Sequence, residues 1–370
     1  TVQWDGISIG PVIHIPGGMT TVPPPEALTA EKASRKARLL SFSPSPTALY
    51  RTIEMVGMIQ GLLYIYSYRF YTSSMLQFGL RAHDFGKDSV EILAARIGQY
   101  GVSSIQLALT KALTSPPYTL GMLSPGYGRN IAKTFSEHKI AIAVLGCYIN
   151  LVHPDAAARH MALSRFEEHL RFCRDFGCSI VGTETGSCNP DCSYHPDTAQ
   201  EKTFETLLHS IERLVKTAER YGVIVGLEAV AGQHTIDSAE KMARLLSIID
   251  SPNLQVIYDP VNLLPVDVPP EVDIKTLENS SGEHQKQLFE HDLEILGDKI
   301  VTVHLKDFRY ENKKKIGNLP ALSGWLDTRT LLGMIMKRKP CIDVLLENSD
   351  PSITKATLTS LHQLIDDLGR

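Results

Sequence analysis

The sequence lacks the features that mark secreted scaffolds and nucleic-acid-binding proteins. Its six cysteines show no pattern of a small disulfide-linked domain, and Cys147, Cys178 and Cys341 lie in or beside apolar runs, where buried free thiols are common. The net charge is only -4 over 370 residues, so the basic excess of a typical nucleic-acid-binding protein is missing. We therefore expect a reducing, cytoplasmic setting and no nucleic-acid partner.

A membrane-spanning segment is also missing from the pattern. Residues 53–71 come nearest, but this run contains Glu54 and Arg69. A spanning helix needs about 20 mostly apolar residues, and a signal peptide has its apolar stretch near the start of the chain. We therefore expect no membrane partner.

The first part of the chain has little regular pattern. Residues 1–74 contain seven of the 21 prolines and show no sustained helical or strand period until about residue 50. This composition predicts an irregular extension, disordered or loosely packed, with at most one helix at its end. A clear domain pattern begins at Met75, which we take as a hypothetical natural start, so we divide the chain into residues 1–74 and 75–370.

From Met75 onward, short apolar runs alternate with amphipathic stretches. The runs are rich in Val, Ile and Leu, as expected for strands buried on both faces. Between the fourth and fifth runs, Phe204, Leu207, Ile211 and Leu214 recur at helical spacing, and Gly222 follows. The eight predicted strands are residues 78–84, 102–109, 140–150, 179–186, 223–230, 254–262, 300–308 and 341–348.

Eight such units over one domain predict an α/β fold, the (β/α)8 TIM barrel. The competing architecture is an open, doubly wound sheet. That architecture would place a G-x-G-x-x-G phosphate turn after an early strand, and the sequence has none there.

Each of the last four predicted strands ends in a side chain that can bind a metal. Residues two apart in a strand share a face, and active sites of TIM barrels lie at the carboxyl ends of the strands. Three carboxylates crowded at that end require a counter-charge, which a divalent cation would supply. Singly, each residue could equally be a cap, a turn or a surface group, but their coincidence predicts one metal site formed by Glu228, Asp259, His304 and Glu347. Oxygen ligands with one imidazole suit Mn²⁺, Mg²⁺, Co²⁺ or Zn²⁺.

At these residues the sequence resembles the xylose-isomerase-like TIM barrel superfamily, which contains sugar phosphate isomerases and epimerases and endonuclease IV. The resemblance covers about residues 76–365. It is carried by INLVHPD (149–155), GTETGSCNPDCSYHP (182–196), GLEAVAGQHT (226–235), YDPVN (258–262), HLKDF (304–308) and LLEN (345–348). It implies metal ligation by the same four residues and, as in the family's keto-sugar epimerases, acid and base roles for Glu228 and Glu347.

Endonuclease IV is the less suitable relative. Its zinc site needs a His three residues after the Asp of strand six, and Asn262 stands there. No Asp-x-His follows His304 before the last strand. DNA repair is therefore disfavoured.

The sequence thus predicts a metal-dependent isomerase or epimerase that transfers a proton next to a carbonyl of a sugar or sugar phosphate. The alternatives are an inosose-type dehydratase or lyase on the same metal site, and a barrel that binds sugar without turnover. Barrels of this size commonly pair, so a homo-oligomer stays open.

Five further residues are expected near the substrate. Lys306 would hold a phosphate or polarise an oxygen, or else form a structural salt bridge. The others have structural alternatives as well, in loop contacts or hydrogen bonds at the rim. The predicted substrate-binding set is Glu184, His195, Asn262, Lys306 and His153.

Overall fold

The computed structural model describes residues 76–114, 119–268 and 274–369, and in 274–281 only the backbone. Three features of the sequence lie outside these ranges: the predicted extension 1–74, the apolar run 53–71 and the hypothetical start at Met75. The division of the chain at residue 75 therefore stays a prediction. In the part described, no helix is long and apolar enough to cross a bilayer.

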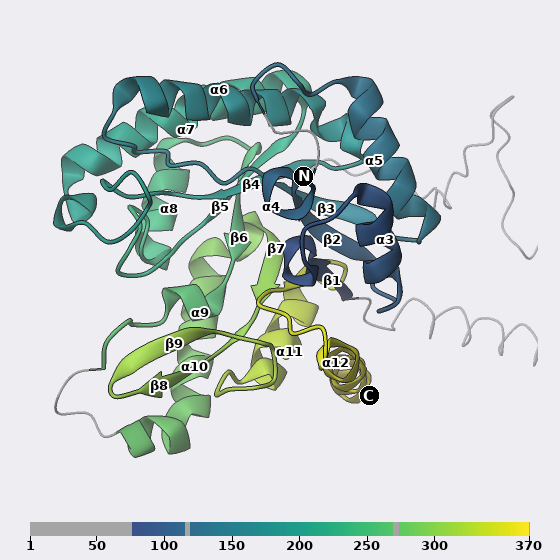
Figure 1. Ribbon diagram of the computed structural model, residues 1–370. Helices are drawn as coiled ribbons and strands as arrows, with labels where there is room; N and C mark the ends of the chain where they lie inside the picture. The colour runs from purple at the N-terminus through teal and green to yellow at the C-terminus, as the bar shows by residue number, and fades with distance from the viewer. Residues whose placement is uncertain (1–75, 115–118, 269–273, 370) are drawn as a thin grey trace, which may run out of the picture. The chain divides into compact units, whose positions relative to one another are not determined.

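Eight parallel strands close into a barrel, which confirms the predicted fold class (Figure 1). Neighbouring strands follow the order β1-β10-β7-β6-β5-β4-β3-β2, so β1 closes the ring by pairing with β10. The strands are β1 (Gln77–Arg81), β2 (Ser104–Ala108), β3 (Ala141–Gly146), β4 (Ile180–Glu184), β5 (Ile224–Glu228), β6 (Leu254–Tyr258), β7 (Ile300–Leu305) and β10 (Asp343–Leu346).

Helices surround the barrel (Figure 1). The α-helices are α3 (Val90–Gly98), α4 (Leu109–Ala112), α5 (Pro125–Glu137), α6 (Ala156–Phe172), α7 (Glu201–Tyr221), α8 (Ala239–Ile248), α9 (Pro260–Leu263), α10 (Ile274–Leu296), α11 (Thr328–Arg338) and α12 (Thr354–Leu368). Short 3-10 helices span Ala82–Phe85, Cys173–Phe176, Pro196–Ala199 and Gly297–Lys299.

The helix α7 shows how sequence sets these elements. Phe204, Leu207, Ile211 and Leu214 are all buried, so the apolar stripe read from the sequence faces the strands. The helix ends at Gly222, whose φ of 62° is the left-handed conformation that glycine adopts at low cost. The end of the helix predicted at Gly222 and the end observed there therefore have the same physical cause.

The barrel interior alternates small and large residues. Val144, Ile257 and Leu345 form an apolar cluster inside the ring, separate from the main core between strands and helices. Glycines make room for them: a β-carbon at Gly182 would lie 2.7 Å from Ile257 Cδ1 and 2.8 Å from Val144 Cγ1. This plug fills the middle of the barrel and separates the polar side chains at its carboxyl end from those at its amino end, such as the Ser104–Asp343 pair.

One predicted strand divides in two. Residues 300–308 were expected to form a single strand, but β7 ends at Leu305. The chain then enters an antiparallel hairpin of β8 (Asp307–Glu311) and β9 (Lys314–Leu319). The turn uses Asn312 and Lys313, both with positive φ. Asp307 Oδ1 accepts from the backbone N–H groups of Phe308 and Leu326, which bends the chain away from the barrel.

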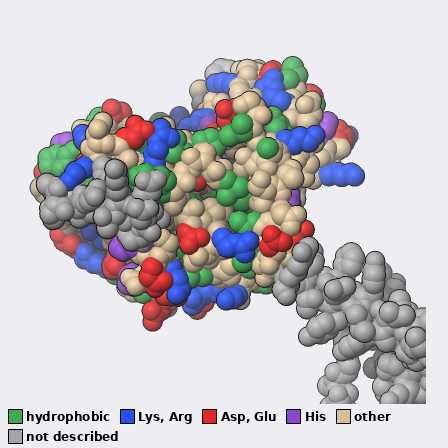
Figure 2. All heavy atoms as spheres, turned by 90° about the horizontal axis from the view of Figure 1, so that it is seen from below, with side chains coloured by type: hydrophobic (Ala, Val, Ile, Leu, Met, Phe, Trp, Pro, Cys, Tyr) green, Lys and Arg blue, Asp and Glu red, His purple; other side chains and the backbone are tan. Residues whose placement is uncertain are grey.

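The surface carries charges of both signs. Lys and Arg side chains lie among Asp and Glu side chains on the face shown in Figure 2. This mixture agrees with the small net charge of -4.

Candidate metal centre

The structure brings the four predicted metal ligands to one place. Glu228 ends β5, Asp259 follows β6, His304 lies in β7 and Glu347 follows β10. Each is at most 4% exposed, and one ligand atom from each lies within 4.8 Å of those of the other three. Donors from four adjacent strands of the ring therefore face a common point inside the mouth of the barrel.

The imidazole of His304 is central to this cluster. Its Nδ1 lies 3.2 Å from Glu228 Oε2 and 3.4 Å from Glu347 Oε1. The same Nδ1 is buried without a hydrogen-bond partner of good geometry, as is Asp259 Oδ2. Asp259 Oδ2 is offset by an ion pair with Lys306, but His304 Nδ1 faces only carboxylate oxygens, an arrangement that fits a bound cation.

Two basic side chains balance part of the negative charge. Lys306 Nζ lies 2.7 Å from Asp259 Oδ2 and 3.1 Å from Glu347 Oε2. Arg81, at the end of β1, reaches Glu347 Oε1 through Nη1 at 3.1 Å. Of the two roles considered for Lys306, its contacts match the structural salt bridge; they do not test a contact with substrate.

Protonation equilibria in the cluster reflect this crowding of charge. Burial lowers the pKa of His304, but Glu347 and Glu228 outweigh it and raise the pKa to about 9. Burial raises the pKa of the Glu347 carboxyl, but His304, Lys306 and Arg81 bring it well below its usual range. Without a bound cation, the imidazole of His304 is therefore protonated, and its positive charge offsets part of the negative charge of the carboxylates.

Neighbouring amides orient two of the ligands. Asn262 Nδ2 donates to Glu228 Oε1 at 2.7 Å, and the Asn262 backbone N–H donates to Asp259 Oδ1 at 3.1 Å. On the far side of the imidazole, His304 Nε2 lies 2.7 Å from Gln106 Oε1, and Gln106 Nε2 donates to Tyr148 Oη. Asn262 thus touches two predicted ligands.

Of the other residues expected near the substrate, Glu184 lies closest to the cluster. It ends β4 and pairs in register with Glu228 on β5. Its side chain is 38% exposed, and its Oε2 lies 3.7 Å from Nδ1 of the buried His234. Loss of hydration at the mouth and the charge of Glu347 raise the pKa of Glu184.

His195 and His153 make loop contacts. His195 Nδ1 accepts from the Asp197 backbone N–H at the start of a 3-10 helix. His153 Nδ1 accepts from the Asp155 backbone N–H, next to the start of α6. Both match the structural alternatives considered for them, and their contact with substrate stays a prediction.

Sequence reasoning missed Arg81, Gln106, Tyr148 and His234. Arg81 and Gln106 had a usable signal, because each ends or nearly ends a strand and shares a face with a small residue two positions earlier. The partners of Arg81 and Gln106 come from β10 and β7, so their roles depend on barrel closure.

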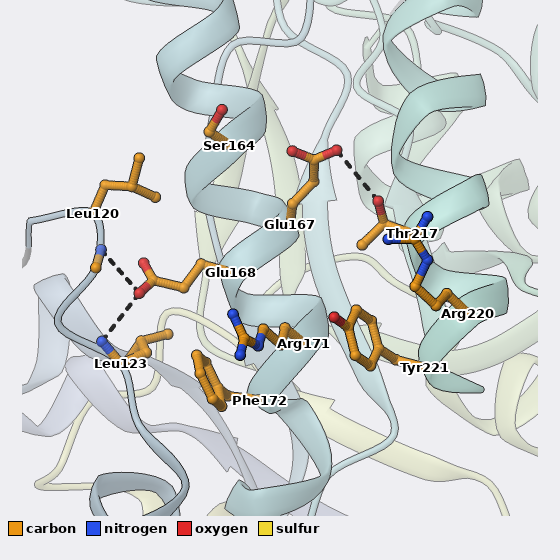
Figure 3. A pocket seen from close by; sticks show the side chains of 11 residues that line it. Leu120, Leu123, Ser164, Glu167, Glu168, Arg171, Phe172, Thr217, Arg220 and Tyr221 are labelled. Atoms are coloured by element: carbon orange, nitrogen blue, oxygen red, sulfur yellow. Dashed lines mark hydrogen bonds between the residues drawn. The ribbon is translucent and has the colours of Figure 1, made fainter.

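A separate surface pocket of about 450 Å³ lies between α6, α7 and residues 120–123 (Figure 3). Its two acidic side chains are already engaged. Glu168 Oε1 accepts from the backbone N–H groups of Gly121 and Leu123, and Glu167 accepts from Thr217 and Arg213. None of the predicted site residues lines it.

Comparisons with known proteins agree with this architecture. The sequence profile of the family described as "Xylose isomerase-like TIM barrel" matches residues 93–364. The search of curated proteins found no match.

Solved structures share the fold at low sequence identity. A 3-keto-D-glucoside 4-epimerase from E. coli is 16% identical with a TM-score of 0.57, over 78% of this chain and 98% of the other. A xylose isomerase-like TIM barrel protein from Mycobacterium smegmatis, in complex with magnesium, is 12% identical with a TM-score of 0.59, over 80% and 98%. The IOLI protein with a bound zinc atom is 15% identical with a TM-score of 0.51, over 79% and 96%.

Proposed function

The chain belongs to the xylose isomerase-like TIM barrel family, and from this premise we propose that it is a metal-dependent isomerase or epimerase of a sugar or sugar phosphate. The reaction is proton transfer at a carbon next to a carbonyl. The observation that carries the proposal is the buried set Glu228, Asp259, His304 and Glu347, whose ligand atoms lie within 4.8 Å of one another.

These four side chains would hold one divalent cation. When bound, a cation stabilises the negative charge that develops on the substrate oxygens. Mn²⁺, Mg²⁺, Co²⁺ and Zn²⁺ all suit three carboxylates and one imidazole. The magnesium and zinc found in two structures of the same fold support a divalent cation without selecting one.

The two glutamates transfer the proton in this proposal. They come from different sides of the ligand set, since Glu228 ends β5 and Glu347 follows β10. One removes the proton from the substrate carbon and the other returns a proton, on the opposite face in an epimerisation. Asn262 holds one oxygen of Glu228, whereas Lys306 and Arg81 hold the two oxygens of Glu347, so both carboxylates have fixed directions.

The decisive experiment combines metal analysis with proton exchange. Purified protein, loaded with Mn²⁺, is incubated in D₂O with a panel of free and phosphorylated ketoses and of inososes. We expect one bound metal per chain and exchange of a substrate C–H for deuterium. Product that has lost water would assign the dehydratase alternative, and metal binding without exchange would leave only a sugar-binding barrel.

Glu228→Gln tests the acid–base role. We expect the exchange rate to fall by at least about 10²-fold, because the amide cannot accept the proton. Metal content is measured in parallel, since Glu228 is also a proposed ligand. The control is Glu205→Gln on the exposed side of α7, which should leave exchange unchanged. Full activity of Glu228→Gln on a confirmed substrate would refute the assignment.

A further inference from the structure

We infer that Gln106 is a positioning residue that fixes the imidazole of His304 in the tautomer able to bind a cation. This inference rests on the proposed metal centre and adds a residue from the opposite half of the barrel. Gln106 lies in β2 and is 2% exposed, whereas the proposed ligands come from β5, β6, β7 and β10.

The two ends of the Gln106 amide have different partners. Its Oε1 lies 2.7 Å from His304 Nε2, and its Nε2 lies 2.5 Å from Tyr148 Oη. An amide oxygen only accepts, so the proton of this bond belongs to His304 Nε2. Once a cation replaces the second proton of His304, the single remaining N–H is on Nε2, and Nδ1 offers its lone pair to the cation among the carboxylates of Glu228 and Glu347.

The reverse orientation of the amide would have the opposite effect. With the amide nitrogen facing His304, the imidazole proton would lie on Nδ1, among the carboxylates, where it would compete with a cation. In the observed orientation, the amide N–H at the other end donates to Tyr148 Oη. The ring of Tyr148 is held in turn, with Lys111 Nζ 3.9 Å from the ring centre and the His83 ring edge-on at 6.5 Å.

Removing a hydrogen bond that orients a metal-binding imidazole commonly lowers metal affinity by about 10- to 100-fold. We therefore expect Gln106→Leu, which removes the acceptor, to weaken Zn²⁺ binding by at least about tenfold at pH 7. Gln106→Glu keeps an acceptor at the same distance and should bind Zn²⁺ within about threefold of the wild type or more tightly. Affinity is measured by competition with a chelator.

Ser104→Ala is the matched control. Ser104 lies on the same strand two residues earlier, is buried, and donates to Asp343 Oδ1 at 2.6 Å. Its loss removes a hydrogen bond in the barrel without touching His304. We expect Ser104→Ala to lower thermal stability in the metal-free protein but to leave the affinity for Zn²⁺ unchanged.

Nitrogen NMR of the Zn²⁺-loaded protein reads the tautomer directly. We expect the proton of His304 on Nε2 and the metal on Nδ1, with this signature lost in Gln106→Leu. A proton on Nδ1, or wild-type affinity in Gln106→Leu, would overturn the inference while leaving the metal centre intact. Failure of the wild type to bind any divalent cation would overturn the metal centre and this inference together.

Discussion

At the scale of single residues, Arg81 connects three groups at the mouth of the barrel. Its Nε donates to Asp84 Oδ1 at 2.9 Å, its Nη2 donates to Asn348 Oδ1 at 2.6 Å, and its Nη1 pairs with Glu347 at 3.1 Å. The planar guanidinium can serve all three because its donors point in fixed, divergent directions. The loop after β10 and the end of β1 are thereby held together.

Arg81→Met should therefore destabilise the metal-free protein by about 3 kcal/mol, because it leaves Asp84 and Glu347 largely buried and short of a cation. Urea unfolding measures this loss. Arg81→Lys keeps the charge but not the fork, and we expect an intermediate loss. The control is Arg309→Met, which breaks an exposed pair with Glu311 and should change stability by no more than about 0.5 kcal/mol. Equal losses for both arginines would contradict this reasoning.

Whether a site residue could be predicted from the sequence depends on whether its role follows from its own strand or from a partner on another strand. Glu228, Asp259, His304 and Glu347 each follow from a local pattern, an apolar strand with a polar end. The roles of Arg81 and Gln106 do not, because each is defined by a partner on another strand. Arg81 meets Glu347 only because β1 pairs with β10 at ring closure, with Gly79 beside Leu345. Periodicity contains no information about that pairing.

At the scale of elements, the apolar runs predicted all eight barrel strands but made most of them too long. The run 341–348 contains β10 at Asp343–Leu346, and the excess at its carboxyl end includes the ligand Glu347. Residues just beyond the ends of the strands, such as Glu347, are buried because the site encloses them. The sequence pattern therefore does not mark where hydrogen bonding between strands stops. The β8–β9 hairpin was missed because its strands are largely half-buried and polar.

The contact between Asp292 of α10 and Tyr258 of β6 predicts how the stability of the protein depends on pH. Burial raises the pKa of Asp292 in α10 from 3.8 to about 6, although the hydroxyl of Tyr258 donates to its Oδ2 at 2.9 Å. Because the pKa is higher in the folded protein, the stabilising contribution of protonated Asp292 is complete below pH 3.8. It is lost as the pH rises through about 6.

Asp292→Asn should therefore stabilise the protein by about 2–3 kcal/mol at pH 8, since the amide is never charged and still accepts from Tyr258. The gain should be constant from pH 8 down to about 7 and then shrink as the pH falls through about 6 toward 4. Denaturant unfolding at several pH values measures it. Asp366→Asn, on the exposed side of α12, should change stability by less than about 0.5 kcal/mol throughout. A gain independent of pH would show that the charge of Asp292 is not the cause.

At the scale of the whole molecule, the closed ring converts distant parts of the sequence into one site. The proposed ligands occupy one half of the mouth, on β5, β6, β7 and β10, while Arg81, Gln106 and Glu184 face them from β1, β2 and β4. The plug of Val144, Ile257 and Leu345 closes the barrel beneath them. A cation bound there would tie together strands that the unfolded chain keeps far apart.

Metal binding should therefore stabilise the entire barrel. A ligand that binds only the folded state, at about 100 times its Kd, adds about 2.7 kcal/mol, which corresponds to a rise in Tm of about 5 °C for a domain of this size. We expect that rise when Mn²⁺ is added to metal-free protein at constant ionic strength, and its reversal by a chelator. Asp259→Asn replaces one charged ligand with a neutral amide and leaves the positive charge of Lys306 beside the site without that partner. We therefore expect Mn²⁺ to raise the Tm of this variant by less than about half as much as that of the unchanged protein. An equal shift in this variant would mean that Mn²⁺ acts at another site.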